Sequence, residues 1–173
     1  YIDDYDGWNA GNNTGTITSA SHGTHLCGIV GGIGNNSIGV AGVNWNVQIM
    51  PVIYGTLTDA NAIASYTYVR DSKREWLNSN GAKGAFIVAT NSSFGIDLAQ
   101  PSAHPLWCAL YDSLGSVGIL SAAATANQNY NIDTQGDMPT ACPSNYLITV
   151  TNTRADDTKG TAGYGATTID LGA

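Results

Sequence analysis

The chain has 173 residues, which is enough for one domain with its own hydrophobic core. Charged residues make up only 11% of it and the formal net charge is -7, so nucleic acid, which needs a basic surface, is not an expected partner. No apolar run is long enough to span a bilayer, so we expect no membrane partner.

The chain opens with an acidic and aromatic stretch, residues 1–9, which we interpret as a solvated turn or, alternatively, as a loop for a hard cation. After a polar connector, the sequence SHGTHLCG at residues 21–28 predicts a helix with Ser21 as its N-cap. Glycines along this helix leave almost no side-chain bulk, so its neighbours must approach the backbone closely. We therefore expect a buried central helix.

His22 stands at the start of this helix. An imidazole there is a candidate general base, because it gains and loses a proton near neutral pH and the surrounding fold can select its tautomer. Two alternatives stay open. The ring could be a histidine satisfied within the core, or His22 could share a zinc site with His25 and Cys27.

The rest of the chain alternates between two periodicities. Residues 57–79 and 100–114 carry apolar side chains at helical spacing, and the second of these stretches begins near a proline. Four stretches predict strands: 47–54, 85–90, 118–124 and 146–151. Strand, helix and strand in succession predict a right-handed crossover, so we expect an α/β fold with a mostly parallel sheet flanked by helices.

The three cysteines allow one disulfide and one free thiol. Cys108 lies on the second predicted helix and Cys142 in the long loop at residues 133–143, whereas Cys27 lies in the helix that we expect to be buried. A bridge between Cys108 and Cys142 is therefore the expected pairing, and it would hold the loop that carries Thr140. Few charges together with abundant Asn, Ser and Thr are typical of an exported protein, so we expect secretion.

The segment HGTHLCGIVGG at residues 22–32, followed by NNSIGVAGV at residues 35–43, resembles the catalytic-histidine segment of the subtilisin-like serine proteases, the subtilases. Later stretches resemble further segments of that family, in the family's order: NSSFG at 91–95, TAN at 125–127 and MPT at 138–140. The resemblance covers nearly the whole chain. It implies a three-layer subtilisin-like fold, with residues 1–173 as the central portion of a single catalytic domain.

The resemblance implies roles for individual residues. His22 would be the base of the catalytic triad, and His25 a structural second histidine. Asn127 would be the amide that stabilises negative charge on the substrate carbonyl oxygen. Because Ala126 stands where the family has glycine, Asn129 stays an alternative to Asn127. The residues implied to contact the substrate are Ser93, Phe94, Gly95, Ala124, Thr125, Ala126 and Thr140.

The family uses the segment at residues 93–95 to pair with an extended substrate strand, so the expected partners are proteins or peptides. An ordinary exit from a strand into a loop is the alternative for this segment. Thr140 replaces a glycine of the family at the floor of the specificity pocket, which would narrow that pocket. The loop around Asn36 resembles a calcium-binding loop of the family, which makes it a candidate site for a structural calcium, while the chemistry itself requires no cofactor.

The nucleophile motif of the family, GTSxAxP, does not occur in the chain. The nearest match, residues 160–163, has no serine. The acidic residues near the start lack the context of the family's catalytic aspartate, so we expect both outer triad members before Tyr1 and after Ala173. The expected function is serine-type endopeptidase. A catalytically inactive pseudoprotease or peptide-binding module is the alternative, and a zinc hydrolase is a third. The segment alone is expected to be inactive and able to self-associate.

Overall fold

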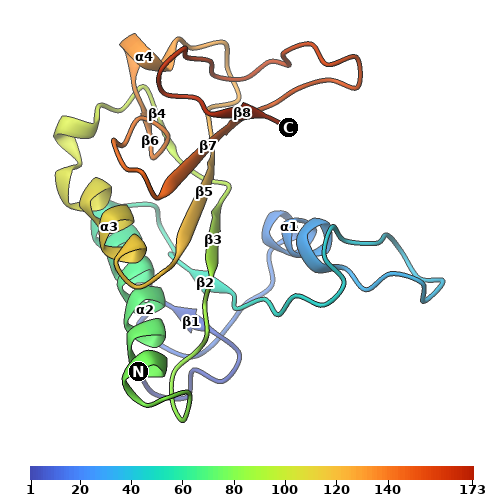
Figure 1. Cartoon of the computed structure of the whole chain (residues 1–173), viewed down its shortest axis with the longest axis vertical. Helices are drawn as coiled ribbons and strands as arrows, with labels where there is room; N and C mark the ends of the chain where they lie inside the picture. The colour runs from blue at the N-terminus through green and yellow to red at the C-terminus, as the bar shows by residue number, and fades with distance from the viewer. The chain divides into compact units, whose positions relative to one another are not determined.

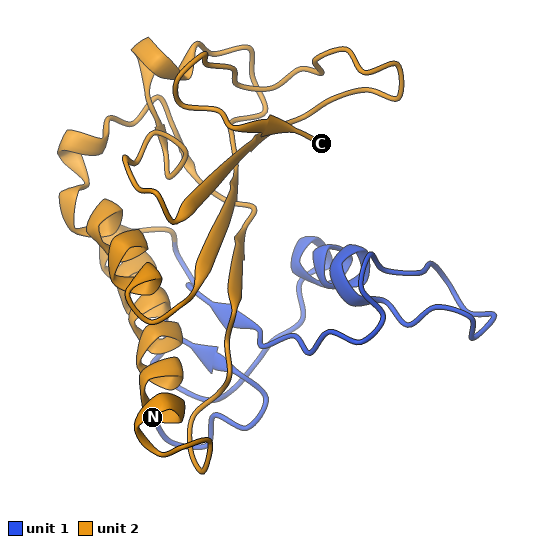
Figure 2. Cartoon of the chain, viewed as in Figure 1, with its two compact units in different colours: residues 1–56 blue, residues 57–173 orange.

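The computed structural model describes all residues from Tyr1 to Ala173 and divides them into two compact units, residues 1–56 and residues 57–173 (Figure 2). Figure 1 labels the helices and strands of both units. The expected single domain over residues 1–173 stays a prediction. None of the helices combines the length and the apolar character that crossing a membrane requires.

In the first unit, strand β1 (Trp8–Asn9) pairs in parallel with strand β2 (Val52–Ile53). The longer buried strand predicted over residues 47–54 is wrong, because Val47 is 37% exposed and Ile49 is 41% exposed. Nor does β2 join the main sheet. A strand is buried only where neighbours pair with it and cover it. Strand β1 offers β2 only two residues of pairing, and Pro51, directly before β2, has no N–H to donate.

Helix α1 (Ser21–Gly31) forms where the sequence predicts it. Ser21 is its first helical residue and not its N-cap. Ala20 takes the N-cap position, and no side chain there accepts a hydrogen bond from the first turn. The helix therefore starts without the side-chain cap that a serine one residue earlier would supply.

The expected burial of α1 is wrong in this structure, since none of its residues is buried. A Cβ atom on Gly23 or Gly28 would meet no atom within 4 Å. Only the end of the helix is packed closely, where Gly42 N donates to Gly32 O at 2.7 Å. The first unit thus approaches the helix backbone closely only near its C-terminal end, whereas small residues all along the helix predict close neighbours over its whole length.

The second unit is built on a four-stranded sheet in which all neighbours run parallel, in the order β3-β5-β7-β8 (Figure 1). The strands are β3 (Ala89–Ser92), β5 (Leu120–Ala124), β7 (Leu147–Thr151) and β8 (Leu171–Gly172). This parallel sheet, with helices beside it, confirms the predicted α/β fold.

Strand β3 begins later than the sequence predicts. Phe86 is 61% exposed and Val88 is 56% exposed, although both lie in an apolar run. Pairing starts at Ala89 because its partner is Leu120, the first residue of β5. The neighbouring strand, and not the apolar run, therefore decides where β3 begins.

Two helices of the second unit pack against each other beside the sheet (Figure 1). Helix α2 (Asp59–Asn78) follows Thr58, whose side chain accepts a hydrogen bond from Asn61 N at 3.2 Å. Helix α3 (Pro105–Gly115) follows the short 3-10 helix η1 (Pro101–Ala103). A proline in the first turn of α3 loses no hydrogen bond, because the N–H groups there have no partner within the helix.

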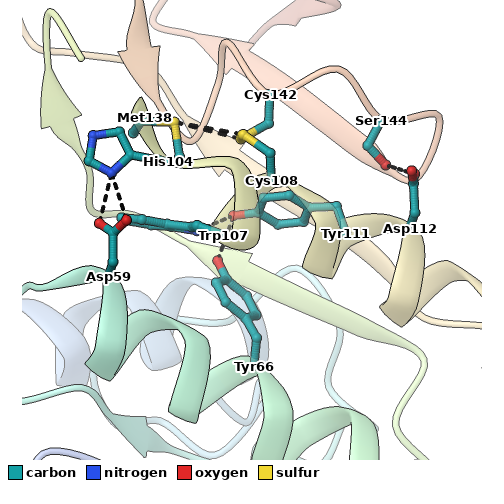
Figure 3. The surroundings of a disulfide bond; sticks show 10 residues. All are labelled: Asp59, Tyr66, His104, Trp107, Cys108, Tyr111, Asp112, Met138, Cys142 and Ser144. Carbon is teal, nitrogen blue, oxygen red and sulfur yellow. Dashed lines mark hydrogen bonds and ion pairs between the residues drawn. A yellow bond between two sulfur atoms is a disulfide. The ribbon is translucent and has the colours of Figure 1, made fainter. Parts of the chain in front are cut away.

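A chain of hydrogen bonds joins α3 and α2 to β3. Trp107 Nε1–H donates to the Tyr111 hydroxyl at 3.2 Å, and the hydroxyls of Tyr111 and Tyr66 lie 2.9 Å apart (Figure 3). The Tyr66 hydroxyl is hydrogen-bonded in turn to the Ser92 hydroxyl. Burial raises the pKa of both tyrosines, so their hydroxyls stay protonated at neutral pH. These bonds fix β3 one residue before Ser93.

Two further contacts hold α3 in place (Figure 3). His104 Nδ1 lies 2.7 Å from Asp59 Oδ1, so the starts of α3 and α2 are joined. The disulfide between Cys108 and Cys142 is present, with the two Cα atoms 5.1 Å apart, which confirms the predicted pairing. The Met138 thioether packs against the bridge, 3.6 Å from Cys142 Sγ.

An antiparallel pair, which the sequence analysis did not predict, lies between β3 and β7 in the sequence. Strand β4 (Ile96–Asp97) pairs with strand β6 (Asp137–Met138), which follows the short helix α4 (Ile132–Gln135). Each strand has two residues, too few for any periodic pattern to be visible in the sequence.

Candidate active site

His22, the predicted base, is the second residue of α1 and is exposed, as is His25. The alternative of a histidine satisfied within the core is therefore wrong in this structure. No three His, Cys, Asp or Glu side chains come close enough to bind a metal, so the zinc alternative gains no support. His22 and Asn36 lie in the first unit, and all the other predicted site residues lie in the second. That His22 and the residues of the second unit form one site therefore stays a prediction.

The loop around Asn36 is exposed, and the Asn36 side-chain oxygen accepts a hydrogen bond from Ile38 N at 3.0 Å. Calcium takes six to eight oxygen ligands, usually with carboxylates among them. Residues 33–40 contain no carboxylate, and the Asn36 side-chain oxygen already accepts one hydrogen bond within its own turn. These residues alone do not complete a calcium site, which stays a prediction, and no step of the chemistry below involves a metal.

The parallel sheet brings the predicted substrate residues of the second unit to one edge. Ser92 pairs with Ala123, so Ser93 and Ala124 leave their strands side by side at the carboxyl ends of β3 and β5. Open α/β sheets bind their ligands at this edge, because loops from neighbouring strands meet there. The edge is therefore where a substrate is expected.

The segment from Ser93 to Gly95 runs against the chain near Met138. A Cβ atom on Gly95 would lie 2.2 Å from Met138 O, so only glycine fits at this position. The Phe94 ring lies 6.2 Å from the Trp107 ring, and the Ser93 hydroxyl accepts a hydrogen bond from the Asn91 amide at 3.1 Å. Backbone proximity and side-chain contacts together hold the segment at the edge.

Asp137, which the sequence analysis missed, joins three of the predicted site residues. Its side chain is buried, with 1% of the residue exposed. Its Oδ2 accepts hydrogen bonds from Thr125 Oγ1 at 3.1 Å, from Ala126 N at 3.1 Å and from the Thr140 hydroxyl. One carboxylate therefore fastens the loop after β5 to the turn after β6.

Burial raises the pKa of the Asp137 carboxyl, although its hydrogen bonds oppose the increase. Asp97 lies directly opposite in the β4–β6 pair and adds a like charge, which raises the pKa further. Asp137 is the only charged residue between Asp133 and Arg154. An isolated charge in an uncharged stretch is the sequence signal that could have identified it.

The partners of Asp137 are themselves buried: Thr125 is 8% exposed, Ala126 6% and Thr140 1%. The two threonine hydroxyls point to the carboxylate and not to solvent. Ala124, Gly95 and Asn127 are the exposed residues of the predicted set at this edge. The side chains of Ser93 and Phe94 are partly exposed beside them.

Asn127 lies three residues after the end of β5, the strand between β3 and β7. Its side chain is exposed and makes no hydrogen bond. The Oδ1 atom of the alternative donor, Asn129, lies 2.6 Å from Lys159 Nζ, a contact that engages the amide oxygen and not its N–H groups. A donor for a developing oxyanion must have a free N–H, and both amides have one, so the choice of Asn127 stays a prediction.

Asp133 fastens the far end of the loop that carries Asn127. Its carboxylate accepts hydrogen bonds from Ala166 N at 2.8 Å, from Thr168 N at 3.0 Å, and from the hydroxyls of Thr167 and Thr168 at 2.9 Å and 2.8 Å. These bonds, the Thr168 hydroxyl first among them, lower the pKa of Asp133 to about 2. The carboxylate is therefore ionised throughout the neutral range.

Residues 1–168 match the model of the subtilase family, Peptidase S8. The chain belongs to the subtilase family. Subtilisin-like protease 1 of Plasmodium berghei is 57% identical over 44 residues, and its counterpart in Plasmodium falciparum (isolate 3D7) is 46% identical over 50 residues. These stretches cover 25% and 28% of this subtilase but only 7% of each relative.

Solved structures show the same fold. The epidermin leader peptide processing serine protease of Staphylococcus aureus superposes with a TM-score of 0.69 at 14% identity, covering 97% of this chain and 46% of that protein. The nisin leader peptidase NisP of Lactococcus lactis has a TM-score of 0.69 at 13% identity, with 95% and 54% covered. The predicted subtilisin-like fold is confirmed, and this subtilase spans about half the length of each structure.

Proposed function

We propose that this subtilase is part of a serine-type endopeptidase that hydrolyses peptide bonds in proteins or peptides through a Ser/His/Asp triad. Family membership over residues 1–168 supports the reaction class. The observation that carries the proposal is the Asn127 amide, which is exposed and makes no hydrogen bond at the carboxyl end of a central strand. An amide left free there can donate to the oxyanion of a bound substrate.

His22 would act as the base. It takes the proton of the serine hydroxyl as the serine oxygen bonds to the substrate carbonyl carbon. The imidazolium then gives that proton to the departing amine as the C–N bond breaks, which leaves an acyl-enzyme. Water, activated by the same imidazole, releases the acid and restores the serine. An exposed imidazole at the start of a helix is accessible for both proton transfers.

The edge formed by Ser93, Phe94 and Gly95 would hold the substrate as an extended strand. Backbone hydrogen bonds along this edge bind any sequence, and side-chain contacts select among sequences. Asn127 Nδ2 would donate to the carbonyl oxygen as it becomes negative. The loss of such a donor costs about 10²–10³ in turnover in an intact site.

No serine within residues 1–173 has the family's nucleophile sequence. We therefore propose that the serine and the carboxylate of the triad come from the remainder of the full-length protein. Secretion is proposed from the family and from the Cys108–Cys142 disulfide, which persists in oxidising compartments. Exposed apolar residues of the first unit, such as Ile33 and Val43, support self-association of the segment alone.

A test begins with the protein expressed from its complete coding sequence. We expect stoichiometric labelling by a fluorophosphonate probe and hydrolysis of an unstructured protein such as casein, both lost in His22→Ala. Asn127→Ala should lower kcat by about 10²–10³ with little change in KM. Gln128→Ala is the matched control, because this neighbouring amide is also exposed but is not a predicted donor.

Other outcomes would separate the alternatives. Binding of extended peptides without labelling or hydrolysis would identify a peptide-binding protein. Hydrolysis that chelators abolish and fluorophosphonates do not affect would identify a metal-dependent enzyme. Labelling of a serine within residues 1–173 expressed alone would show that the nucleophile is misplaced, since this segment is expected to be unreactive.

A further inference from the structure

Lys159 makes an unusually complete set of contacts for an exposed lysine. Its ammonium lies 2.6 Å from Asn129 Oδ1, 2.9 Å from Gly160 O and 3.0 Å from Ala162 O. A lysine ammonium has three N–H donors, and here each has an oxygen within hydrogen-bond distance. The Tyr164 ring lies 5.4 Å away and adds a cation–π contact. No donor is left over for a ligand.

These acceptors come from two segments. Asn129 lies in the loop after β5, and Gly160 and Ala162 lie in the loop between β7 and β8. Backbone bonds join the same two loops on either side of Asn129. Gly163 N donates to Ala126 O at 2.8 Å, and Tyr164 N donates to Tyr130 O at 2.9 Å.

Residues 127–129 lie between these two backbone bonds. Asn127 makes no hydrogen bond, and the only bond of Gln128 is local, from Tyr130 N to its carbonyl. The contact between Asn129 and Lys159 is therefore the one hydrogen bond that ties residues 127–129 to the opposite loop. Ala126, directly before Asn127, is held by Asp137 and Gly163, and the Lys159 contact is the next restraint after Asn127 on the same loop.

We propose that Lys159 is a positioning residue for Asn127: by holding the Asn129 side chain against the loop between β7 and β8, it places the Asn127 amide where the substrate oxyanion forms. This inference rests on the proposed function. An oxyanion donor must lie about 2.7–3.1 Å from the charged oxygen, and a displacement of about 1 Å can cost up to about 10²-fold in rate. A free loop would allow such a displacement.

The chemistry of lysine suits this role. An ammonium on a flexible stem can point its three donors to three oxygens that surround it, whereas the guanidinium of arginine holds its donors in a fixed plane. Methionine keeps most of the stem and removes the donors. Lys159→Met should therefore break the contact with little loss of packing, and Lys159→Arg should restore it only in part.

The experiment measures peptide hydrolysis by the full-length protein. Lys159→Met should lower kcat about tenfold, less than the loss of the amide itself, and leave KM unchanged. Asn129→Ala removes the acceptor and should have the same effect, and the double variant should be no worse than either single variant. Lys83→Met is the matched control, because the Lys83 side chain is exposed and makes no hydrogen bond.

The decisive comparison uses Asn127→Ala as the background. If Lys159 acts through Asn127, Lys159→Met should have no further effect on kcat once the amide is absent. The inference would be overturned if Lys159→Met lowered kcat equally in the wild-type and Asn127→Ala backgrounds. It would also be overturned if either Lys159→Met or Asn129→Ala left kcat of the wild-type background unchanged. If Asn127→Ala itself leaves kcat unchanged, the result contradicts the role of Asn127 in the proposed function, and with it the inference that rests on that role. Asn129→Ala, which changes only an exposed side chain, keeps the test valid if Lys159→Met does not fold.

Discussion

Removal of the Cys108–Cys142 disulfide should destabilise the second unit strongly. The bridge spans a sequence separation of 34 residues and ties helix α3 to the turn that carries Thr140. In the chain-entropy account, opening a loop of this length increases the entropy of the unfolded chain by an amount worth about 4 kcal/mol. Because domains are stable by only about 5–15 kcal/mol, this loss is a large fraction of the total.

The measurement is urea unfolding of wild type and of the Cys108→Ala/Cys142→Ala variant. Alanine is the better replacement for this buried pair, since serine would bury two hydroxyls. With a slope of about 2 kcal/mol per M, the midpoint should fall by about 2 M. Cys27→Ala, at the free cysteine, should leave the midpoint unchanged. Equal midpoints for all three proteins would show that the bridge contributes nothing to stability.

Three further changes test the polar contacts. Because the folded-state pKa of Asp137 is raised, the free energy of unfolding should fall as the pH rises from about 4 through that pKa. Urea titrations between pH 4 and 8 should show this decline in wild type and not in Asp137→Asn. Asp133 acts in the opposite sense. Its pKa of about 2 implies a contribution to the free energy of unfolding that is complete above about pH 4 and is lost between pH 4 and 2. Asp133→Asn should reduce this loss of stability at acid pH. Tyr66→Phe should lower the free energy of unfolding by about 1–2 kcal/mol, because Ser92 and Tyr111 lose a buried partner, whereas Tyr5→Phe at an exposed ring should not.

Elements with a strong local signal could be predicted from the sequence. Helix α2 has apolar side chains at helical spacing over its whole length, and β5 and β7 are apolar runs of strand length. The apolar run at residues 85–88 led to a predicted strand that begins too early. Strand pairing, which is not a local property, sets where β3 begins. The predicted burial of α1 is wrong for a similar reason. The glycine content of the helix indicates close neighbours but does not show which segment supplies them.

The candidate site divides in a similar way. Motif resemblance leads to Asn127 and to the segment from Ser93 to Gly95, because these residues lie next to each other in recognisable strings. It does not lead to Asp137 or Lys159, whose partners lie elsewhere in the sequence. Lys159 and Asn129 are 30 residues apart, and only the parallel pairing of β5 with β7 brings their loops together.

The role of Asp137 follows from the composition of the whole chain. With 13 acidic and 6 basic residues, most carboxylates cannot find a cation, and Asp59 with His104 is the one ion pair that joins two different elements. Asp71 pairs with Arg70 and Arg74 within α2, and other carboxylates accept hydrogen bonds from neutral donors, as Asp112 does from the Ser144 hydroxyl at 2.6 Å. A carboxylate held by hydroxyls and backbone N–H groups has no counter-charge for salt to screen, so these contacts should persist at high ionic strength. Asp137 is such a carboxylate, held by Thr125, Ala126 and Thr140, and neither apolar periodicity nor motif resemblance detects it.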